Sequence, residues 1–165
     1  YRRLADMRDR TPGQTVLEIG CGWGGVARLL AREYGAKVVG LTLSTEQRAE
    51  AMERIARDGL SDQIEIRLQD YRDVTGSFDR IASIEMLEAV GESYWPTYFA
   101  TVRDRLTPGG RAAIQVITSQ PPFVLWLEVN FLQQRLKAQV ASVNIADCVK
   151  RHSLFWGKIK KLLPT

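Results

Sequence analysis

Residues 16–25 read Val-Leu-Glu-Ile-Gly-Cys-Gly-Trp-Gly-Gly, and this stretch decides the fold. Its first half, VLEIG, predicts a short buried strand, and the glycine turn CGWGG follows at once. Apolar residues then recur at helical spacing over Val26–Tyr34. A strand that runs through a glycine turn directly into a helix is typical of the first unit of a ligand-binding parallel α/β sheet.

The following residues repeat the alternation of strand and helix. Lys37–Leu41 predicts a second strand and Thr45–Asp58 a second helix, which Ser44 caps and Gly59 ends. Gln47, three residues after Ser44, completes a capping box. The same reasoning predicts strands at Ile64–Leu68, Phe78–Ile84 and Arg111–Ile117, and a helix at Tyr94–Leu106. We therefore expect a Rossmann-like α/β fold, a mostly parallel sheet with helices on both faces.

The glycine turn has the composition of a site that a ligand approaches closely. Gly20 and Gly22 would let backbone N–H groups reach a ligand that a Cβ would block, and Gly24 would permit close helix packing. The spacing is GxGxG instead of the GxGxxG of dinucleotide enzymes. Glu18 adds a negative charge that disfavours a pyrophosphate and favours a cationic ligand, which points to S-adenosylmethionine. The alternative is a tight turn that binds nothing.

Polar residues after the next two strands could hold the rest of such a ligand. Asp70 and Tyr71 follow the third predicted strand, where a carboxylate can accept from an adenine amino group and a ring can cover its face. Thr42 stands where ribose-binding folds usually have an acid, so a ribose contact falls to Gln47, the nearest long polar side chain. Gln47 also has its capping role, and both roles stay open.

Six segments in this order establish a family resemblance: VLEIGCGWGG, VVGLTLSTEQ, LQDYRD, FDRIASIEMLEAVG, YWPTYF and LTPGGRAAIQVIT. Residues 1–119 resemble the cyclopropane-fatty-acyl-phospholipid synthase family. The resemblance implies a class I methyltransferase fold and transfer of a methylene unit from S-adenosylmethionine to the cis double bond of an unsaturated phospholipid acyl chain at the membrane surface. The cofactor residues that it implies are Gly20 and Gly22 for the methionine part, Thr42, Leu43 and Gln47 for the ribose, and Asp70 and Tyr71 for the adenine.

The same resemblance implies a bound bicarbonate that removes a proton from the newly added carbon. Glu88 matches the family's bicarbonate-site glutamate, with the backbone of Ile84 beside it. Gln115 stands where many relatives have a His; glutamine can donate and accept hydrogen bonds but cannot take the proton away. Without the resemblance, Glu88 would be a helix-start carboxylate favoured by the helix dipole. We expect catalytic roles for Glu88, Gln115 and Ile84, with S-adenosylmethionine and bicarbonate as cofactors.

Several family features have no counterpart in this chain, so we expect a domain truncated at both ends. The segment with a bicarbonate-site cysteine and a cofactor-binding tyrosine and serine would precede Tyr1, and the family's late tyrosine has no residue to align with it. These gaps predict impaired cofactor binding and weak or absent turnover. They leave two alternatives, a methyltransferase for another small or lipid substrate and a non-catalytic cofactor-binding fragment.

The residues after 119 depart from the family pattern, so we expect a methyltransferase-like domain over 1–119 and a helical basic tail over 120–165. Residues 150–163 mix cations with bulky apolar residues, which suits either a membrane-surface segment or a solvated end. An apolar stripe at helical spacing predicts a helix that packs on the fifth strand of an incomplete sheet. The stripe consists of Leu125, Val129, Leu132, Leu136, Val140 and Val143.

Charge and composition exclude several classes of function. The net charge of the 165 residues is +4, but residues 1–120 have 16 Lys and Arg against 17 Asp and Glu, and residues 121–165 have 7 against 2. A near-neutral body without a basic face argues against nucleic-acid binding. Cys21, Cys148 and a single His offer no metal-binding spacing, and no apolar run is long enough to span a bilayer. We expect a cytoplasmic protein, peripheral at the inner face of the membrane, that acts on a phospholipid acyl chain.

Overall fold

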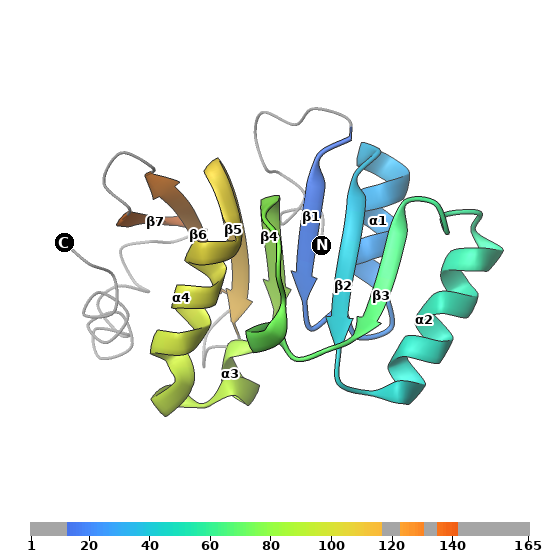
Figure 1. Cartoon of the computed structure of the whole chain (residues 1–165), viewed down its shortest axis with the longest axis horizontal. Helices are drawn as coiled ribbons and strands as arrows, with labels where there is room; N and C mark the ends of the chain where they lie inside the picture. Colours follow the sequence, from blue (N-terminus) through green and yellow to red (C-terminus); the bar gives the residue numbers. More distant parts are fainter. Residues whose placement is uncertain (1–12, 117–122, 131–134, 142–165) are drawn as a thin grey trace.

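A seven-stranded sheet forms the middle layer of the computed structural model, which describes residues 13–116, 123–130 and 135–141 (Figure 1). The strand order is β3-β2-β1-β4-β5-β6-β7; β1 to β5 are parallel, and β6 and β7 are antiparallel. The five parallel strands therefore end at one edge, the lower edge in Figure 1, and the order reverses between β1 and β4. The strands are β1 Thr15–Ile19, β2 Lys37–Thr42, β3 Ile64–Leu68, β4 Phe78–Ile84, β5 Leu106–Val116, β6 Phe123–Asn130 and β7 Arg135–Ala141.

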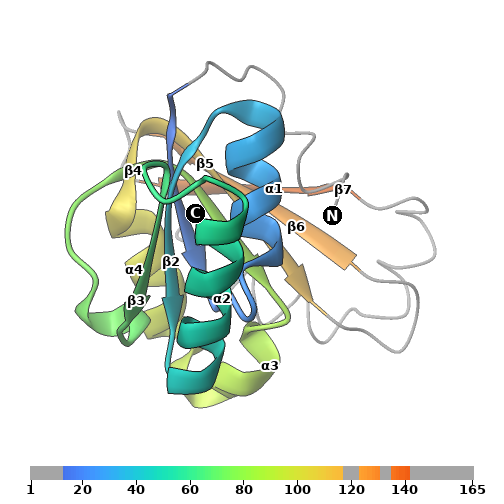
Figure 2. The same cartoon turned by 90° about the vertical axis from the view of Figure 1, so that its right-hand side faces the viewer.

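Helices cover both faces of the sheet, as Figure 2 shows from the side. Helices α1 (Gly25–Tyr34) and α2 (Thr45–Arg57) pack on one face, and α3 (Leu87–Val90) and α4 (Trp95–Arg105) pack on the other. Two short 3-10 helices, η1 and η2, span Tyr71–Asp73 and Glu92–Tyr94. The expected Rossmann-like α/β fold is confirmed.

The core consists of two apolar clusters, one on each face of the sheet. Because side chains of a strand alternate between faces, Val16 joins the cluster under α1 and α2, whereas Leu17 and Ile19 join the cluster under α3 and α4. The largest fully buried side chains, Tyr98 and Phe99, belong to the α4 side. Each helix is therefore held by its own apolar face against the sheet.

The helix ends follow the predicted capping chemistry in part. Ser44 Oγ accepts a hydrogen bond from the Gln47 backbone N–H at 3.1 Å, and Gly59 adopts a left-handed φ of 68° just beyond α2. The reciprocal half of the expected capping box is replaced, because the Ser44 N–H donates to Thr42 Oγ1 at 3.1 Å instead of to Gln47. The Gln47 side chain is thereby available for another contact.

The predicted helix of the tail is wrong over residues 123–130 and 135–141, which form β6 and β7. The sheet is therefore not incomplete after β5, since β6 pairs antiparallel with β5 and β7 with β6. A short apolar run fits either periodicity, and FVLWLEV is rich in the branched and aromatic residues that favour strands. Residues 150–163 lie outside the described part of the chain.

Gly40 in β2 packs closely against Cys21 of the glycine turn and Ile66 of β3. A Cβ at Gly40 would lie 2.8 Å from Ile66 Cδ1 and 2.9 Å from Cys21 Cβ, so Gly40→Ala should lower the free energy of unfolding by about 1–3 kcal/mol. Denaturant titration measures the change. Gly25→Ala is the control, because a Cβ there meets no heavy atom within 4 Å; equal destabilisation of both variants would refute the packing argument.

Candidate functional site

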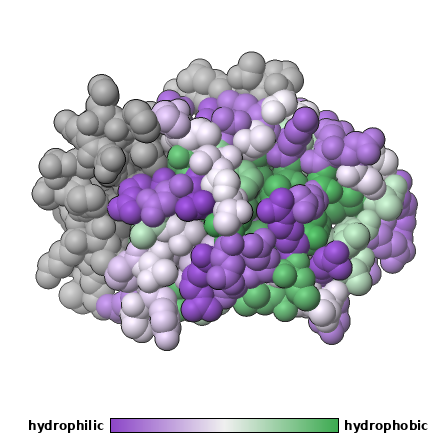
Figure 3. Space-filling model, viewed as in Figure 1, coloured by the Kyte–Doolittle hydropathy of each residue, from purple (hydrophilic) through white to green (hydrophobic). Residues whose placement is uncertain are grey.

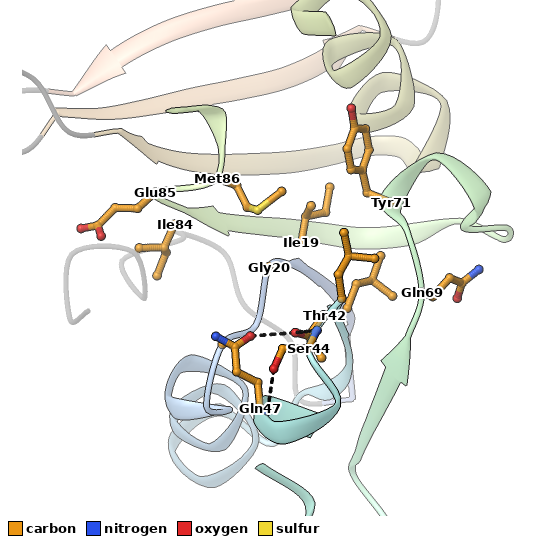
Figure 4. A pocket seen from close by; sticks show the side chains of 13 residues that line it. Ile19, Gly20, Thr42, Ser44, Gln47, Gln69, Tyr71, Ile84, Glu85 and Met86 are labelled. Atoms are coloured by element: carbon orange, nitrogen blue, oxygen red, sulfur yellow. Dashed lines mark hydrogen bonds between the residues drawn. The ribbon is translucent and has the colours of Figure 1, made fainter. Parts of the chain in front are cut away.

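A pocket of about 470 Å³ opens at the carboxyl edge of the sheet (Figure 4). It lies where the strand order reverses, the usual ligand site of an open parallel sheet. Its walls come from the turn after β1 and from the ends of β2, β3 and β4. The lining residues are Ile19, Gly20, Gly22, Leu41, Thr42, Leu43, Ser44, Gln47, Gln69, Tyr71, Ile84, Glu85 and Met86.

The glycine turn forms one wall of the pocket through Gly20 and Gly22. Both have left-handed φ values, 78° and 52°, which glycine adopts without steric cost. The backbone N–H groups of Gly20 and Cys21 both donate to the Leu41 carbonyl oxygen, at 3.1 and 2.8 Å, so the turn is anchored to the end of β2. The Gly20 N–H is thus used within the fold, and the room for a close backbone approach is at Gly22, where a Cβ would meet no heavy atom within 4 Å.

Gly24 lies apart from the pocket. It is buried, and its φ of 74° places a hypothetical Cβ 3.1 Å from Ala51 Cβ in α2. The close packing predicted for Gly24 is present, with α2 as the partner. Gly24 is not among the lining residues, so a direct cofactor contact at this position has no support from the pocket geometry.

Thr42 and Gln47 form a hydrogen-bonded pair inside the pocket, as Figure 4 shows. Thr42 Oγ1 donates to Gln47 Oε1 at 2.7 Å while it accepts from the Ser44 N–H. The backbone of Gln47 serves the helix cap, and its side chain faces the pocket, so the two roles that the sequence left open are served by different groups. Its amide NH2 group can donate to a ligand hydroxyl.

At the end of β3 the pocket is lined by Gln69 and Tyr71, whereas Asp70 is not a lining residue. Arg72 holds the Asp70 carboxylate in a bidentate ion pair, with Nε to Oδ1 at 2.9 Å and Nη2 to Oδ2 at 2.7 Å. Hydrogen bonds from Arg72 keep the pKa of Asp70 below its ordinary value. Tyr71 packs edge-on against Tyr98, with ring centroids 5.5 Å apart. Sequence reasoning missed Gln69, although it directly precedes the Asp70 that was singled out.

The opposite wall comes from Ile84, Glu85 and Met86 after β4. Glu85 has a φ of 55°, a left-handed conformation unusual for this residue type, and its N–H donates to the Gln115 carbonyl oxygen at 2.9 Å. Ile84 and Gln115 are direct neighbours across β4 and β5. Glu88 is exposed in α3 and does not line the pocket. The structure thus brings Ile84 and Gln115 together, and places Glu88 just beyond the Met86 wall.

Glu18 does not present a charge to the pocket, contrary to the sequence-based argument. Its side chain is 2% exposed, it does not line the pocket, and within the described ranges its Oε2 atom has no hydrogen-bond partner. Burial raises the pKa of Glu18 from 4.5 to about 8, which the Ala27 backbone N–H offsets only in part. At neutral pH the carboxyl is therefore mostly protonated, and any preference for a cation must come from other groups.

The described residues contain no group of three or more His, Cys, Asp or Glu side chains placed to hold a metal ion. None of the helices within these ranges combines the length and apolar character that crossing a bilayer requires.

A parallel sheet of this order with a glycine-lined pocket at its carboxyl edge defines the Rossmann-like fold of S-adenosylmethionine-dependent methyltransferases. Cyclopropane synthase MmaA2 from Mycobacterium tuberculosis has the same fold, with a TM-score of 0.63 at 33% identity over 66% of this chain and 38% of its own. Mycolic acid cyclopropane synthase CmaA1, solved with SAH and CTAB, aligns with a TM-score of 0.61 at 28% identity over 64% of this chain and 37% of its own.

Comparison of the sequence with known proteins shows the family to which this chain belongs. The family model described as mycolic acid cyclopropane synthetase matches residues 1–136, so the chain belongs to this family. Cyclopropane-fatty-acyl-phospholipid synthase of Escherichia coli is 48% identical over 119 residues, 72% of this chain and 30% of that protein. Tuberculostearic acid methyltransferase UfaA1 of M. tuberculosis is 47% identical over 116 residues, 70% of this chain and 27% of that protein. The chain thus spans less than a third of the length of these relatives.

Proposed function

We propose that this protein transfers a methylene unit from S-adenosylmethionine to the double bond of an unsaturated phospholipid acyl chain. The observation that supports this most is the convergence of Gly20, Gly22, Thr42, Leu43, Gln47 and Tyr71 on one pocket. These residues come from three separate stretches of the sequence, and the family resemblance implies a cofactor role for each of them. The relatives named for cyclopropane synthesis and fatty-acid methylation support the lipid part of the proposal.

The pocket fits the cofactor that this reaction requires. The space beside Gly20 is held by Met86, whereas a Cβ at Gly22 would meet no heavy atom within 4 Å, and the Gln47 amide offers a donor where the ribose is expected. Gly20 and Gly22 would hold the methionine part, Thr42, Leu43 and Gln47 the ribose, and Tyr71 the adenine face. Asp70 can reach the adenine only if it shares the Arg72 ion pair or leaves it. When bound, S-adenosylmethionine supplies an electrophilic methyl group; the residues named here orient it.

Proton removal is the task that we assign to the region after β4. Glu88 in α3, the Gln115 side chain and the Ile84 backbone would hold a bicarbonate ion that accepts the proton lost by the new carbon. Gln115 is half-buried beside Ile84 and can position such an ion, while Glu88 would accept a hydrogen bond from it.

The carboxyl edge of the sheet, where the pocket opens, suits contact with a lipid surface. Five large apolar side chains are exposed in the described ranges; of these, Trp23, Leu43 and Leu68 lie in turns or at a strand end at the carboxyl edge, and Tyr94 is the last residue of η2, which follows β4 and α3. Figure 3 shows apolar side chains gathered over the half of the molecule that carries β2, β3 and α2. We therefore propose peripheral binding at a membrane, with the pocket mouth toward the lipid.

Two measurements test the proposed function. Calorimetric titration with S-adenosylhomocysteine should show one binding site. Incubation with S-adenosylmethionine, bicarbonate and vesicles of unsaturated phosphatidylethanolamine should then yield lipid heavier by one CH2 unit, with cyclopropane ring protons in the NMR spectrum. Binding without a mass gain would support the non-catalytic alternative, and absence of binding would refute the proposal.

Glu88→Gln should separate catalysis from binding. Because Glu88 does not line the pocket, we expect S-adenosylhomocysteine affinity within about twofold of the wild type, and product formation at least about tenfold slower. Glu53→Gln, which removes an exposed carboxylate of α2, is the control and should match the wild type in both. Full product formation in Glu88→Gln would remove Glu88 from the mechanism.

A further inference from the structure

The Met86 side chain occupies the space directly above Gly20. Its Cγ lies 2.4 Å and its Sδ 2.8 Å from the position that a Cβ on Gly20 would take. Figure 4 shows the thioether directed toward Gly20 and Ile19 across the pocket. Met86 is thus a wall of the pocket at the glycine that is expected to contact the methionine part of the cofactor.

The backbone of Met86 lies directly before the first residue of α3 and closes the turn that begins this helix. The Met86 carbonyl oxygen accepts hydrogen bonds from the N–H groups of Ala89 and Val90, both at 3.0 Å. α3 has only four residues, Leu87–Val90, so these two bonds are its main internal restraint. Glu88 lies between the acceptor and the two donors, and its position depends on this turn.

The chain immediately before Met86 is fixed. The Glu85 N–H is tied to the Gln115 carbonyl oxygen at the end of the sheet, and Glu85 takes up the strained left-handed φ of 55°. Met86 is therefore the first residue past the rigid strand. The buried Leu87 side chain and the bond from Trp95 Nε1 to the Leu87 carbonyl oxygen at 3.3 Å hold the start of α3 on the core, so a contact with the Met86 side chain acts on the turn that the Met86 carbonyl group closes.

We propose that Met86 is a positioning residue through which a cofactor in the pocket orders α3 and thereby sets Glu88. This inference rests on the proposed function, because it requires that the pocket binds S-adenosylmethionine or its product. A ligand that packs against the Met86 thioether restricts that side chain, and the restriction stabilises the turn that the Met86 carbonyl closes. Cofactor binding and the placement of Glu88 are then one coupled equilibrium.

Hydrogen exchange at Ala89 and Val90 tests the coupling directly. Saturating S-adenosylhomocysteine should slow exchange of these two amides at least about tenfold in the wild type. In Met86→Ala, which leaves the backbone bonds possible, saturating ligand should change the exchange less than about twofold, and its affinity should fall about three- to tenfold through lost packing. Met86→Leu, of similar volume, should restore the slowing. Met52→Ala, an exposed methionine of α2 outside the pocket, should behave as the wild type.

Each outcome bears on a different claim. If S-adenosylhomocysteine binds the wild type but leaves the Ala89 and Val90 amides unchanged, the coupling is refuted while the proposed function stands. Equal slowing in Met86→Ala at saturation would show that α3 is ordered without Met86, which also overturns the inference. If the wild type binds no ligand, both the inference and the proposed function fail.

Discussion

The free energy of unfolding should fall as the pH rises from about 5 to 8, and Glu18→Gln should abolish most of this fall. Burial raises the pKa of Glu18 from 4.5 to about 8, so between these values the folded chain retains a proton that the unfolded chain has released. The contribution of Glu18 to the free energy of unfolding is therefore most favourable below pH 4.5 and declines as the pH approaches 8. A shift of this size corresponds to up to about 5 kcal/mol.

Urea titrations at several pH values measure this dependence. Glu65→Gln is the control, because the hydrogen bond from the Arg67 side chain lowers the pKa of Glu65, in the direction opposite to the shift of Glu18. The control should keep the slope of the wild type, and Glu18→Gln should be nearly flat across the same window. Parallel curves for the wild type and Glu18→Gln would mean that Glu18 titrates normally in the folded protein.

Gly20→Ala should weaken S-adenosylhomocysteine binding by at least about 100-fold. The new Cβ would force Met86 away from its place in the pocket wall, since Met86 Cγ lies 2.4 Å from that position, and would strain a φ of 78°. Met86 has nowhere to move that leaves the pocket unchanged, because it is itself a wall. Calorimetric titration measures the loss.

Gly76→Ala controls for backbone strain in this experiment. Gly76 has a φ of 85° with no heavy atom within 4 Å of a Cβ, and it lies outside the pocket, so its substitution should lower stability and leave affinity intact. In a Gly20→Ala/Met86→Ala double variant the collision is gone, and only the backbone strain remains. Unchanged affinity in Gly20→Ala would rule out a ligand contact at this turn.

Much of the fold is predictable because local pattern and tertiary packing agree over residues 15–84. The bounds of β3 and β4 match the predicted strands, and Ser44 caps α2 as its side chain type suggests. β6 and β7 were mispredicted because an apolar run of this length fits a helix or a strand equally. Their assignment depends on hydrogen bonds to β5, which no local pattern contains.

The residues of the candidate site could also be predicted only in part. Residues at strand ends could be found from their place in the alternation, which led to Gly20, Thr42 and Tyr71. Met86 and Glu85 could not, because their roles follow from a left-handed turn and from a contact with a residue 66 positions earlier in the chain. The burial that raises the pKa of Glu18 likewise depends on neighbours that only the folded chain supplies, whereas the Asp70–Arg72 pair joins residues two positions apart.

The division of the core by the sheet has a consequence for how this protein can be altered. Cys21 and Ala51, which support the glycine turn from behind, belong to one cluster, and Leu87, which anchors α3, belongs to the other. The two clusters have no buried residue in common. Selection or design can therefore repack the half behind the cofactor turn while leaving the packing under α3 as it is, and the two halves form separate modules for directed evolution.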